Sequence, residues 1–219
     1  YIRQPLADFQ VLIGPNASGK TTFLDVVAFL GDLLTRGPDE AIASRSTDIH
    51  DLFFNGAGSR FELAVELETP EERRCALPPD TPSRYVRYEV AIGLDSDSGE
   101  HHIFDEQVVL GNASSKKRRS AQTTLFPSFT VAPSSIMSKT RVREGQKRVV
   151  RKKHNGNDNF YSETAGKGKG GWAPSIRLGP RKSALANMPA DETKFPISAW
   201  LRESLIDGAL NDPDHGAVR

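Results

Sequence analysis

One eight-residue motif constrains this chain more than any other feature. The segment Gly14-Pro15-Asn16-Ala17-Ser18-Gly19-Lys20-Thr21 fits the phosphate-binding pattern G-x-x-x-x-G-K-[ST]. A short apolar run at residues 9–13 precedes it and predicts a buried parallel strand. The run Thr21–Thr35 follows it with apolar residues at helical spacing and predicts a helix. Strand, glycine loop and helix in this order predict that the chain binds a nucleoside triphosphate.

The residue types of the loop indicate how a triphosphate is held. Glycines at both ends let the backbone turn so that consecutive N–H groups face the phosphates. Lys20 is expected to reach the β- and γ-phosphates, and the Thr21 hydroxyl is the predicted ligand of Mg²⁺. Asn16 either stabilises the loop or contacts the γ-phosphate, and Thr22 fits a helix start better than a second metal ligand. The predicted ATP-binding residues are Gly14, Pro15, Asn16, Ala17, Ser18, Gly19, Lys20, Thr21 and Thr22.

Composition and cysteine content exclude several classes of protein. The chain has 219 residues, of which 37% are hydrophobic and 26% charged, and no apolar run has the length of a membrane span. It shows no secretory signal. Its single cysteine, Cys75, excludes an internal disulfide and a cysteine-rich metal site. The sequence therefore predicts a cytoplasmic protein with no membrane partner.

The net charge of +1 conceals a strong asymmetry between the two halves. Residues 1–112 carry nine Lys and Arg against nineteen Asp and Glu, whereas residues 113–219 carry twenty against nine. Between 116 and 182, seventeen basic residues face only three acidic ones. Such a block is either a surface for nucleic acid or an acidic partner, or a solvated face, and charge alone does not decide between them.

Turn residues divide the chain into three predicted parts. In residues 1–112, the phosphate loop and its helix precede a predicted antiparallel meander, because the connections are too short for crossover helices. Residues 113–182 are predicted to form a basic insertion of loops and a hairpin that turns at Asn155-Gly156. Residues 183–219 are predicted to be helical. The predicted meander strands are Arg60–Glu68, Arg84–Leu94 and His101–Leu110; a short helical piece is predicted at Asp48–Phe54, a further strand at Thr123–Val131 and a helix at Ile197–Leu210.

This order resembles the nucleotide-binding head of ABC-type ATPases, in which an antiparallel β-subdomain accompanies the first lobe. Gln10–Leu24 is similar to the opening of SMC-like and RecF-like heads, although that family has Gly where this chain has Ala17. Other stretches are similar to a prokaryotic AAA family of ATPases from overcoming-lysogenization-defect, Septu-like and retron-associated anti-phage systems. These stretches are Asp51-Leu52-Phe53, Tyr88–Ile92, Phe104–Gln107 and Lys182–Leu185. The resemblance implies an α/β P-loop NTPase: the first lobe of an ABC-type head with an antiparallel β-subdomain.

The second half of that family's active site is not recognisable in the sequence. No apolar run ends in Asp-Glu, and no signature motif or switch histidine follows. Glu106 follows only Ile103 and Phe104, and we interpret it as a strand-end charge. Either a further segment or a separate polypeptide is then expected to complete the site. The family also uses a Gln to link the metal to the second lobe, and Gln107, Gln122 and Gln146 are equal candidates.

The resemblance implies an ATPase that uses ATP and Mg²⁺ and pairs with a second ATPase head in a homodimer or higher assembly. Lys20 is its implied catalytic residue in this chain. The basic region 116–182 would face nucleic acid or an effector or nuclease subunit, in anti-phage defence or DNA repair. Two alternatives remain open: the ATPase subunit of a transporter, and a non-hydrolysing module that binds ATP only to assemble.

The histidines predict no metal site. His101 and His102 are adjacent on a predicted strand and point to opposite faces. His50, His154 and His215 have no Cys or carboxylate at ligand spacing, so zinc is not expected.

Overall fold

The computed structural model describes residues 2–4, 6, 11, 13–16, 19–53, 56, 58–112, 133–138, 141–165 and 174–210. The predicted strand at Thr123–Val131 and the candidate Gln122 lie outside these residues. No helix among them is both long enough and apolar enough to cross a membrane.

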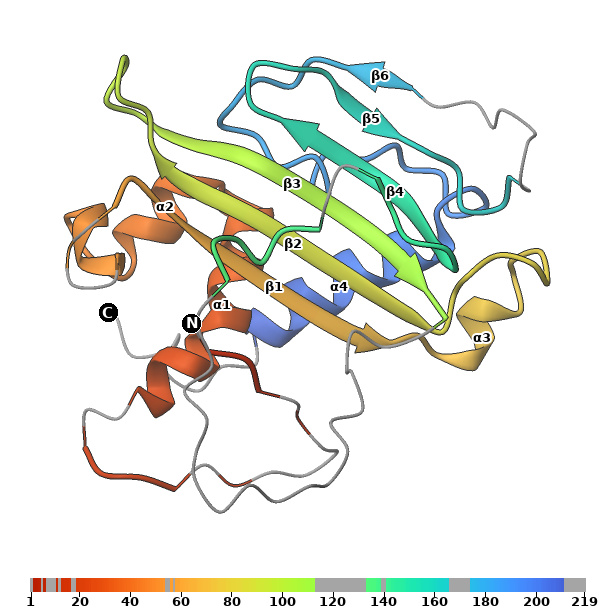
Figure 1. The fold of residues 1–219 in the computed structure, drawn as a ribbon, viewed down its shortest axis with the longest axis horizontal. Coiled ribbons are helices and arrows are strands. Elements are labelled where there is room, and N and C mark those ends of the chain that lie inside the picture. Colours follow the sequence, from red (N-terminus) through yellow and green to blue (C-terminus); the bar gives the residue numbers. More distant parts are fainter. Residues whose placement is uncertain are drawn as a thin grey trace.

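The centre of the fold is one six-stranded antiparallel sheet in which each strand pairs with its neighbours in the chain (Figure 1). The strand order is β1-β2-β3-β4-β5-β6, so the sheet is a meander without crossovers. Short polar turns join β2 to β3 and β4 to β5, and Asn155 has a positive φ of 57° in the second turn. The strands are β1 (Arg60–Glu68), β2 (Tyr85–Leu94), β3 (His101–Gly111), β4 (Gln146–Lys153), β5 (Asp158–Phe160) and β6 (Ser175–Ile176).

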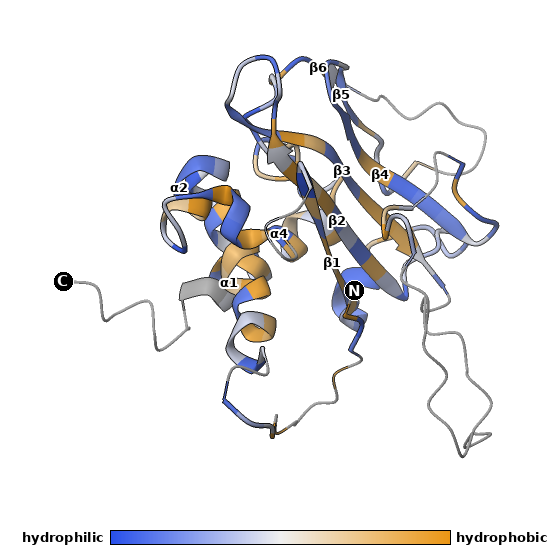
Figure 2. Cartoon of the chain, turned by 60° about the vertical axis from the view of Figure 1, so that its left-hand side comes forward, coloured by the Kyte–Doolittle hydropathy of each residue, from blue (hydrophilic) through white to orange (hydrophobic). Residues whose placement is uncertain are grey.

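A helical layer covers one face of this sheet. Buried apolar residues of both layers form one cluster, and Figure 2 colours stretches of α1, α4 and the strands orange for their hydrophobic residues. The two long helices pack against each other beneath β1 and β2 (Figure 1). The helices are α1 (Lys20–Arg36), α2 (Pro38–Ala43), α3 (Glu71–Arg74) and α4 (Pro196–Leu210), with a 3₁₀ helix at Ile49–Leu52.

The core joins both layers into one cluster. Leu30 and Leu33 of α1 belong to the same cluster as Ile197 and Leu201 of α4, and all four side chains are fully buried. The sheet contributes alternate residues of its central strands, as expected for a strand with one face on the core. These sheet residues are Val86, Tyr88, Val90, Ile92, Val108, Leu110 and Val150.

Most predicted elements are confirmed, namely the three meander strands, the Asn155-Gly156 hairpin, the short helical piece after Asp48 and the two long helices. Local sequence does not predict the helix of residues 38–43, because Gly37-Pro38 is typical of the end of a helix. Pro38 instead starts a new helix, where its missing N–H carries no cost. The four-residue helix α3 was missed as well.

The predicted buried strand before the phosphate loop is wrong for the residues that the structure describes there. Val11 and Ile13 are not in a strand, and their exposed fractions are 64% and 90%. A strand needs neighbours on its edges, and the pairing of β1–β6 includes neither residue. The apolar face of α1 is likewise buried only in its second half, since Leu24 and Val27 are exposed.

Candidate functional site

The phosphate loop passes into helix α1 through a left-handed glycine. Gly19 has φ 81° and ψ 15° and is the N-cap of the helix. A Cβ at this position would meet no atom within 4 Å, so the backbone conformation rather than space requires glycine. The Gly19 carbonyl accepts the first helical bond, from the N–H of Phe23 at 2.9 Å. The sequence spacing of the motif is thus realised as a loop that ends at a helix N-terminus.

The lysine of the motif turns back over the loop. Lys20 Nζ donates to the carbonyl oxygens of Gly14 at 2.8 Å and Pro15 at 2.7 Å. These bonds place the ammonium group over the loop that precedes its own helix. Of the other predicted site residues, Asn16, Thr21 and Thr22 are exposed, whereas Ala17 and Ser18 lie outside the described residues.

The N-terminus of α1 carries neither a capping side chain nor an acidic residue in its first turn. The N–H groups of a first helical turn have no acceptor within the helix, and the 17-residue helix places a partial positive charge at this end, so it can bind an anion. A neutral or acidic cap would have competed for these same groups. The electrostatics of this helix end favour a phosphate.

Arg45 neutralises the acidic residues farther along α1. Its guanidinium holds Asp25 with two bonds of 2.7 Å and Asp32 with one of 2.9 Å. It also donates to the carbonyl of Ala41 and the hydroxyl of Ser44. Asp32 is only 3% exposed, so it depends on this partner. Sequence reasoning missed the clamp, although the two aspartates are seven positions apart and therefore lie on one face of the helix.

These features fit MgATP by the chemistry of the donor set. Lys20 supplies a cation at the loop, α1 supplies N–H groups without an acidic neighbour, and the exposed Thr21 supplies a hydroxyl. Lys20 and the helix N-terminus are the groups that would hold the phosphates, and the Thr21 oxygen is of the type that Mg²⁺ prefers.

Helix α4, which supports α1, is capped by a distant carboxylate. Glu163 lies after β5, and its oxygens accept the N–H groups of Ile197 at 2.7 Å and Ser198 at 2.8 Å, together with the Ser198 hydroxyl. These N–H groups belong to the first turn of α4, which has no partner for them within the helix. Burial raises the pKa of Glu163, against the hydrogen bonds from Ser198 and Ile197, which lower it. No local sequence signal marks this long-range cap.

Glu106 is a buried anchor in the middle of β3, so the interpretation as a strand-end charge is wrong. One oxygen accepts the N–H of Leu185 and the hydroxyls of Tyr88 and Ser183, and the other accepts the N–H of Ala184 at 2.6 Å. Burial raises the pKa of Glu106 although these bonds favour the charged form. The side chain has no exposed surface, and all its bonds are to the protein. It holds the segment after β6 against the sheet.

Some basic residues of the region 116–182 are buried and form ion pairs within the fold. Lys152 is 2% exposed and binds Asp158 at 2.9 Å, and Arg151 is 8% exposed and binds Asp105 at 3.0 Å. For these residues of β4 the solvated-face interpretation is wrong, because their side chains pair across the sheet. The exposed basic residues in the described part of the region are Arg141, Arg143, Lys153, Arg177, Arg181 and Lys182.

The two glutamine candidates within the described residues, Gln107 and Gln146, differ in their surroundings. Gln107 is buried; its amide donates to Glu89 at 2.5 Å and to the Ser138 carbonyl, and it accepts from Arg148 and Arg151. Its polar groups are thus engaged in a network on the sheet. Gln146 accepts a local N–H, from Arg143.

Comparison with known protein families gives a match for the part of the chain that contains the phosphate loop. Residues 9–113 match an AAA domain family. That family is described as AbiEii toxin-like and as part of a type IV toxin–antitoxin system. The match spans the phosphate loop, α1 and β1–β3, and it supports a P-loop ATPase domain of the AAA type. The six-stranded sheet with its helical layer fits an α/β fold of the P-loop type. Comparisons with curated proteins and with solved structures found no match.

Proposed function

We propose that this chain is the ATP-binding part of an SMC-like, ABC-type ATPase head. The observation that carries the proposal is Lys20, which reaches back over the loop carbonyls at the uncapped N-terminus of α1. Bound ATP would replace Gly14 and Pro15 as partners of the ammonium group, while the helix N–H groups take the phosphates. The AAA family match over residues 9–113 supports this assignment.

Lys20→Ala is expected to weaken MgATP binding at least tenfold, which corresponds to about 1.4 kcal/mol or more. The variant removes a charge-assisted contact to the phosphates and leaves the helix N-terminus in place. Isothermal titration calorimetry with MgATP measures the change. Lys153→Ala, which removes an exposed lysine at the end of β4, is the matched control and should bind as the wild-type chain does. If Lys20→Ala and wild type bind MgATP equally, the proposal is wrong.

The proposed site is half of a two-head arrangement. A second ATPase head, with a glutamate that activates water, would complete hydrolysis in a homodimer or higher assembly. Exposed apolar residues near the loop support an incomplete site: Val11, Ile13 and Leu24 are each at least 60% exposed. Such side chains are normally covered in the working assembly.

We further propose that the exposed part of the basic region binds nucleic acid, as a head in anti-phage defence or DNA repair would require. Arg141 and Arg143 precede β4, and Lys153 is its last residue, so exposed cations lie at both ends of the strand. Phosphate contacts of this type are independent of sequence and depend strongly on salt.

Binding to a double-stranded DNA oligonucleotide tests this part. The double variant Arg141→Gln/Arg143→Gln should weaken binding and lower the slope of log affinity against log salt by about 1 for each lost phosphate contact. Arg36→Gln/Arg84→Gln is the matched control, because both side chains are about 60% exposed and lie outside the region. No DNA binding, or an equal slope in both variants, would favour a protein partner instead.

A further inference from the structure

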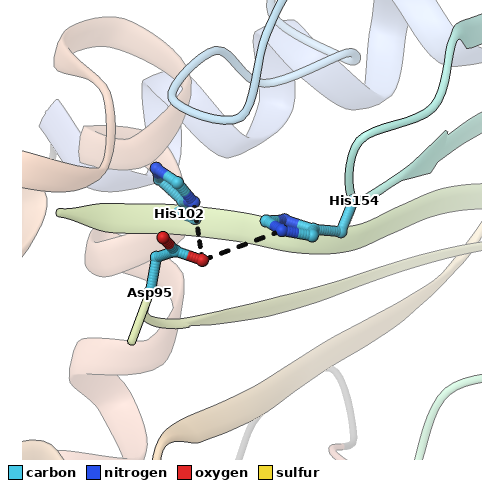
Figure 3. A group of neighbouring side chains, drawn as sticks. All are labelled: Asp95, His102 and His154. Atoms are coloured by element: carbon cyan, nitrogen blue, oxygen red, sulfur yellow. Dashed lines mark ion pairs between the residues drawn. The ribbon is translucent and has the colours of Figure 1, made fainter. Parts of the chain in front are cut away.

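Three potential metal ligands that are distant in the sequence meet at one end of the sheet (Figure 3). Asp95 directly follows β2, His102 is the second residue of β3, and His154 directly follows β4. Because β3 is antiparallel to both neighbours, its start lies beside their ends. One ligand atom from each residue lies within 4.8 Å of the other two.

The distances between the ligand atoms of these residues are too long for hydrogen bonds, but they are close to the distances between two ligand atoms of one metal ion. Asp95 Oδ1 lies 3.6 Å from His102 Nδ1 and 3.8 Å from His154 Nε2. Ligand atoms of one tetrahedral Zn²⁺ lie about 3.4 Å apart, given metal–ligand distances of about 2.0–2.2 Å. His102 Nδ1 is buried and has no hydrogen-bond partner, and the His102 side chain is only 9% exposed. A buried unpartnered nitrogen that faces a carboxylate needs an explanation, and an ion supplies one.

The surrounding contacts orient the ligands. Asp95 Oδ2 accepts the N–H and the hydroxyl of Ser98, which leaves Oδ1 for the histidines. These bonds lower the pKa of Asp95, so it is a carboxylate. The His154 ring stacks on Phe104 at 4.7 Å, and its backbone N–H donates to the Phe104 carbonyl. Phe104 is the extra residue of a β-bulge, because the pairing steps from Ala91–Asp105 to Ile92–Ile103.

A second carboxylate stands behind one of the histidines. Glu100 Oε2 lies 3.7 Å from His102 Nε2, on the opposite side of the ring from Nδ1, and Glu100 is itself held by Arg181 at 3.1 Å. At 3.7 Å this carboxylate is not hydrogen-bonded to Nε2, but it lies on the side of the ring where a metal-binding histidine usually has a carboxylate partner.

We propose that Asp95, His102 and His154 bind one divalent transition-metal ion of the Zn²⁺ class. Two imidazoles and a carboxylate are a ligand set for such ions and not for Mg²⁺ or Ca²⁺, which prefer oxygen. Three protein ligands leave a fourth position for water. The ion ties the β2–β3 turn to the β4–β5 turn. This site is separate from the phosphate loop and does not depend on the proposed ATPase function.

Titration of the untagged chain with Zn²⁺ in the absence of nucleotide tests the proposal. Calorimetry should give one ion per chain, Co²⁺ should develop the visible absorption of a tetrahedral site, and Zn²⁺ should raise the Tm. His154→Gln and Asp95→Asn should each weaken Zn²⁺ binding at least tenfold and abolish the rise in Tm. Both side chains are partly exposed, so these variants are expected to fold.

His101→Gln is the matched control. It removes a neighbouring histidine that has its own partner, Asp39 Oδ1 at 2.9 Å, and should leave Zn²⁺ binding unchanged. The proposal is overturned if the wild-type chain binds no Zn²⁺ at micromolar concentrations. It is also overturned if His101→Gln weakens binding as much as His154→Gln does, since the ion would then bind elsewhere.

Discussion

Replacing Glu106 by Ala is expected to lower the free energy of unfolding by about 4 kcal/mol. The carboxylate is the shared acceptor for the backbone N–H groups of Ala184 and Leu185 and for the hydroxyls of Tyr88 and Ser183. The hydroxyls can rotate toward other acceptors, but the two N–H groups would remain buried without one. Each such group costs about 1–3 kcal/mol, and the emptied volume adds a loss of packing.

Urea unfolding followed by circular dichroism measures this effect. Glu68→Ala is the matched control, because Glu68 lies on β1 of the same sheet with a side chain that is 61% exposed. It should change stability by no more than about 0.5 kcal/mol. If Glu106→Ala is as stable as Glu68→Ala, the segment that contains Ala184 is held by other contacts and the anchor role is wrong.

The raised pKa of Glu106 makes the free energy of unfolding depend on pH, and the direction of the pKa shift decides the sign of this dependence. Its pKa is raised in the folded chain above the ordinary value of 4.5, so the folded state binds the proton more tightly than the unfolded state. The contribution of this group to stability is therefore largest below pH 4.5 and decreases as the pH rises through the folded pKa. Glu106→Gln does not titrate, so its stability should approach that of wild type as the pH rises. If the difference in free energy of unfolding between wild type and Glu106→Gln increases as the pH rises, Glu106 does not bind a proton more tightly in the folded state.

Local pattern predicted most of this fold from the sequence. Alternation predicted β1 with its observed bounds, helical spacing predicted α1 and α4, and Asn155-Gly156 predicted the β4–β5 turn. Each of these signals lies within a short stretch of chain. The strand expected at residues 9–13 shows the limit of such signals, because an apolar run indicates burial but not the neighbours that provide it.

The tertiary polar contacts were not predictable from the sequence, because each joins residues that are far apart in the chain. Glu106 reaches Ala184 across 78 positions, and Glu163 reaches Ser198 across 35. The cluster of Asp95, His102 and His154 has the same origin: spacing along one strand argued against zinc, whereas pairing between strands brings the three residues together. The phosphate loop was recognisable because its function resides in consecutive residues.

Replacing Glu163 by Ala is expected to lower the free energy of unfolding by about 3 kcal/mol and to loosen the first turn of α4. The N–H groups of Ile197 and Ser198 lose their acceptor, and Pro196 before them supplies no donor or cap in exchange. Since α4 packs along α1, part of this loosening should reach the helix that carries Lys20.

Hydrogen exchange distinguishes a lost cap from general destabilisation. In Glu163→Ala the amides of Ile197 and Ser198 should exchange faster than those later in α4, such as Leu205, whereas a purely global effect would accelerate all three alike. Glu203→Ala removes an exposed glutamate from the same helix and should leave exchange at Ile197 unchanged. If the amide of Ile197 remains protected in Glu163→Ala, water or another side chain caps α4. The long-range contact from Glu163 to α4 would then contribute little to the stability of this helix.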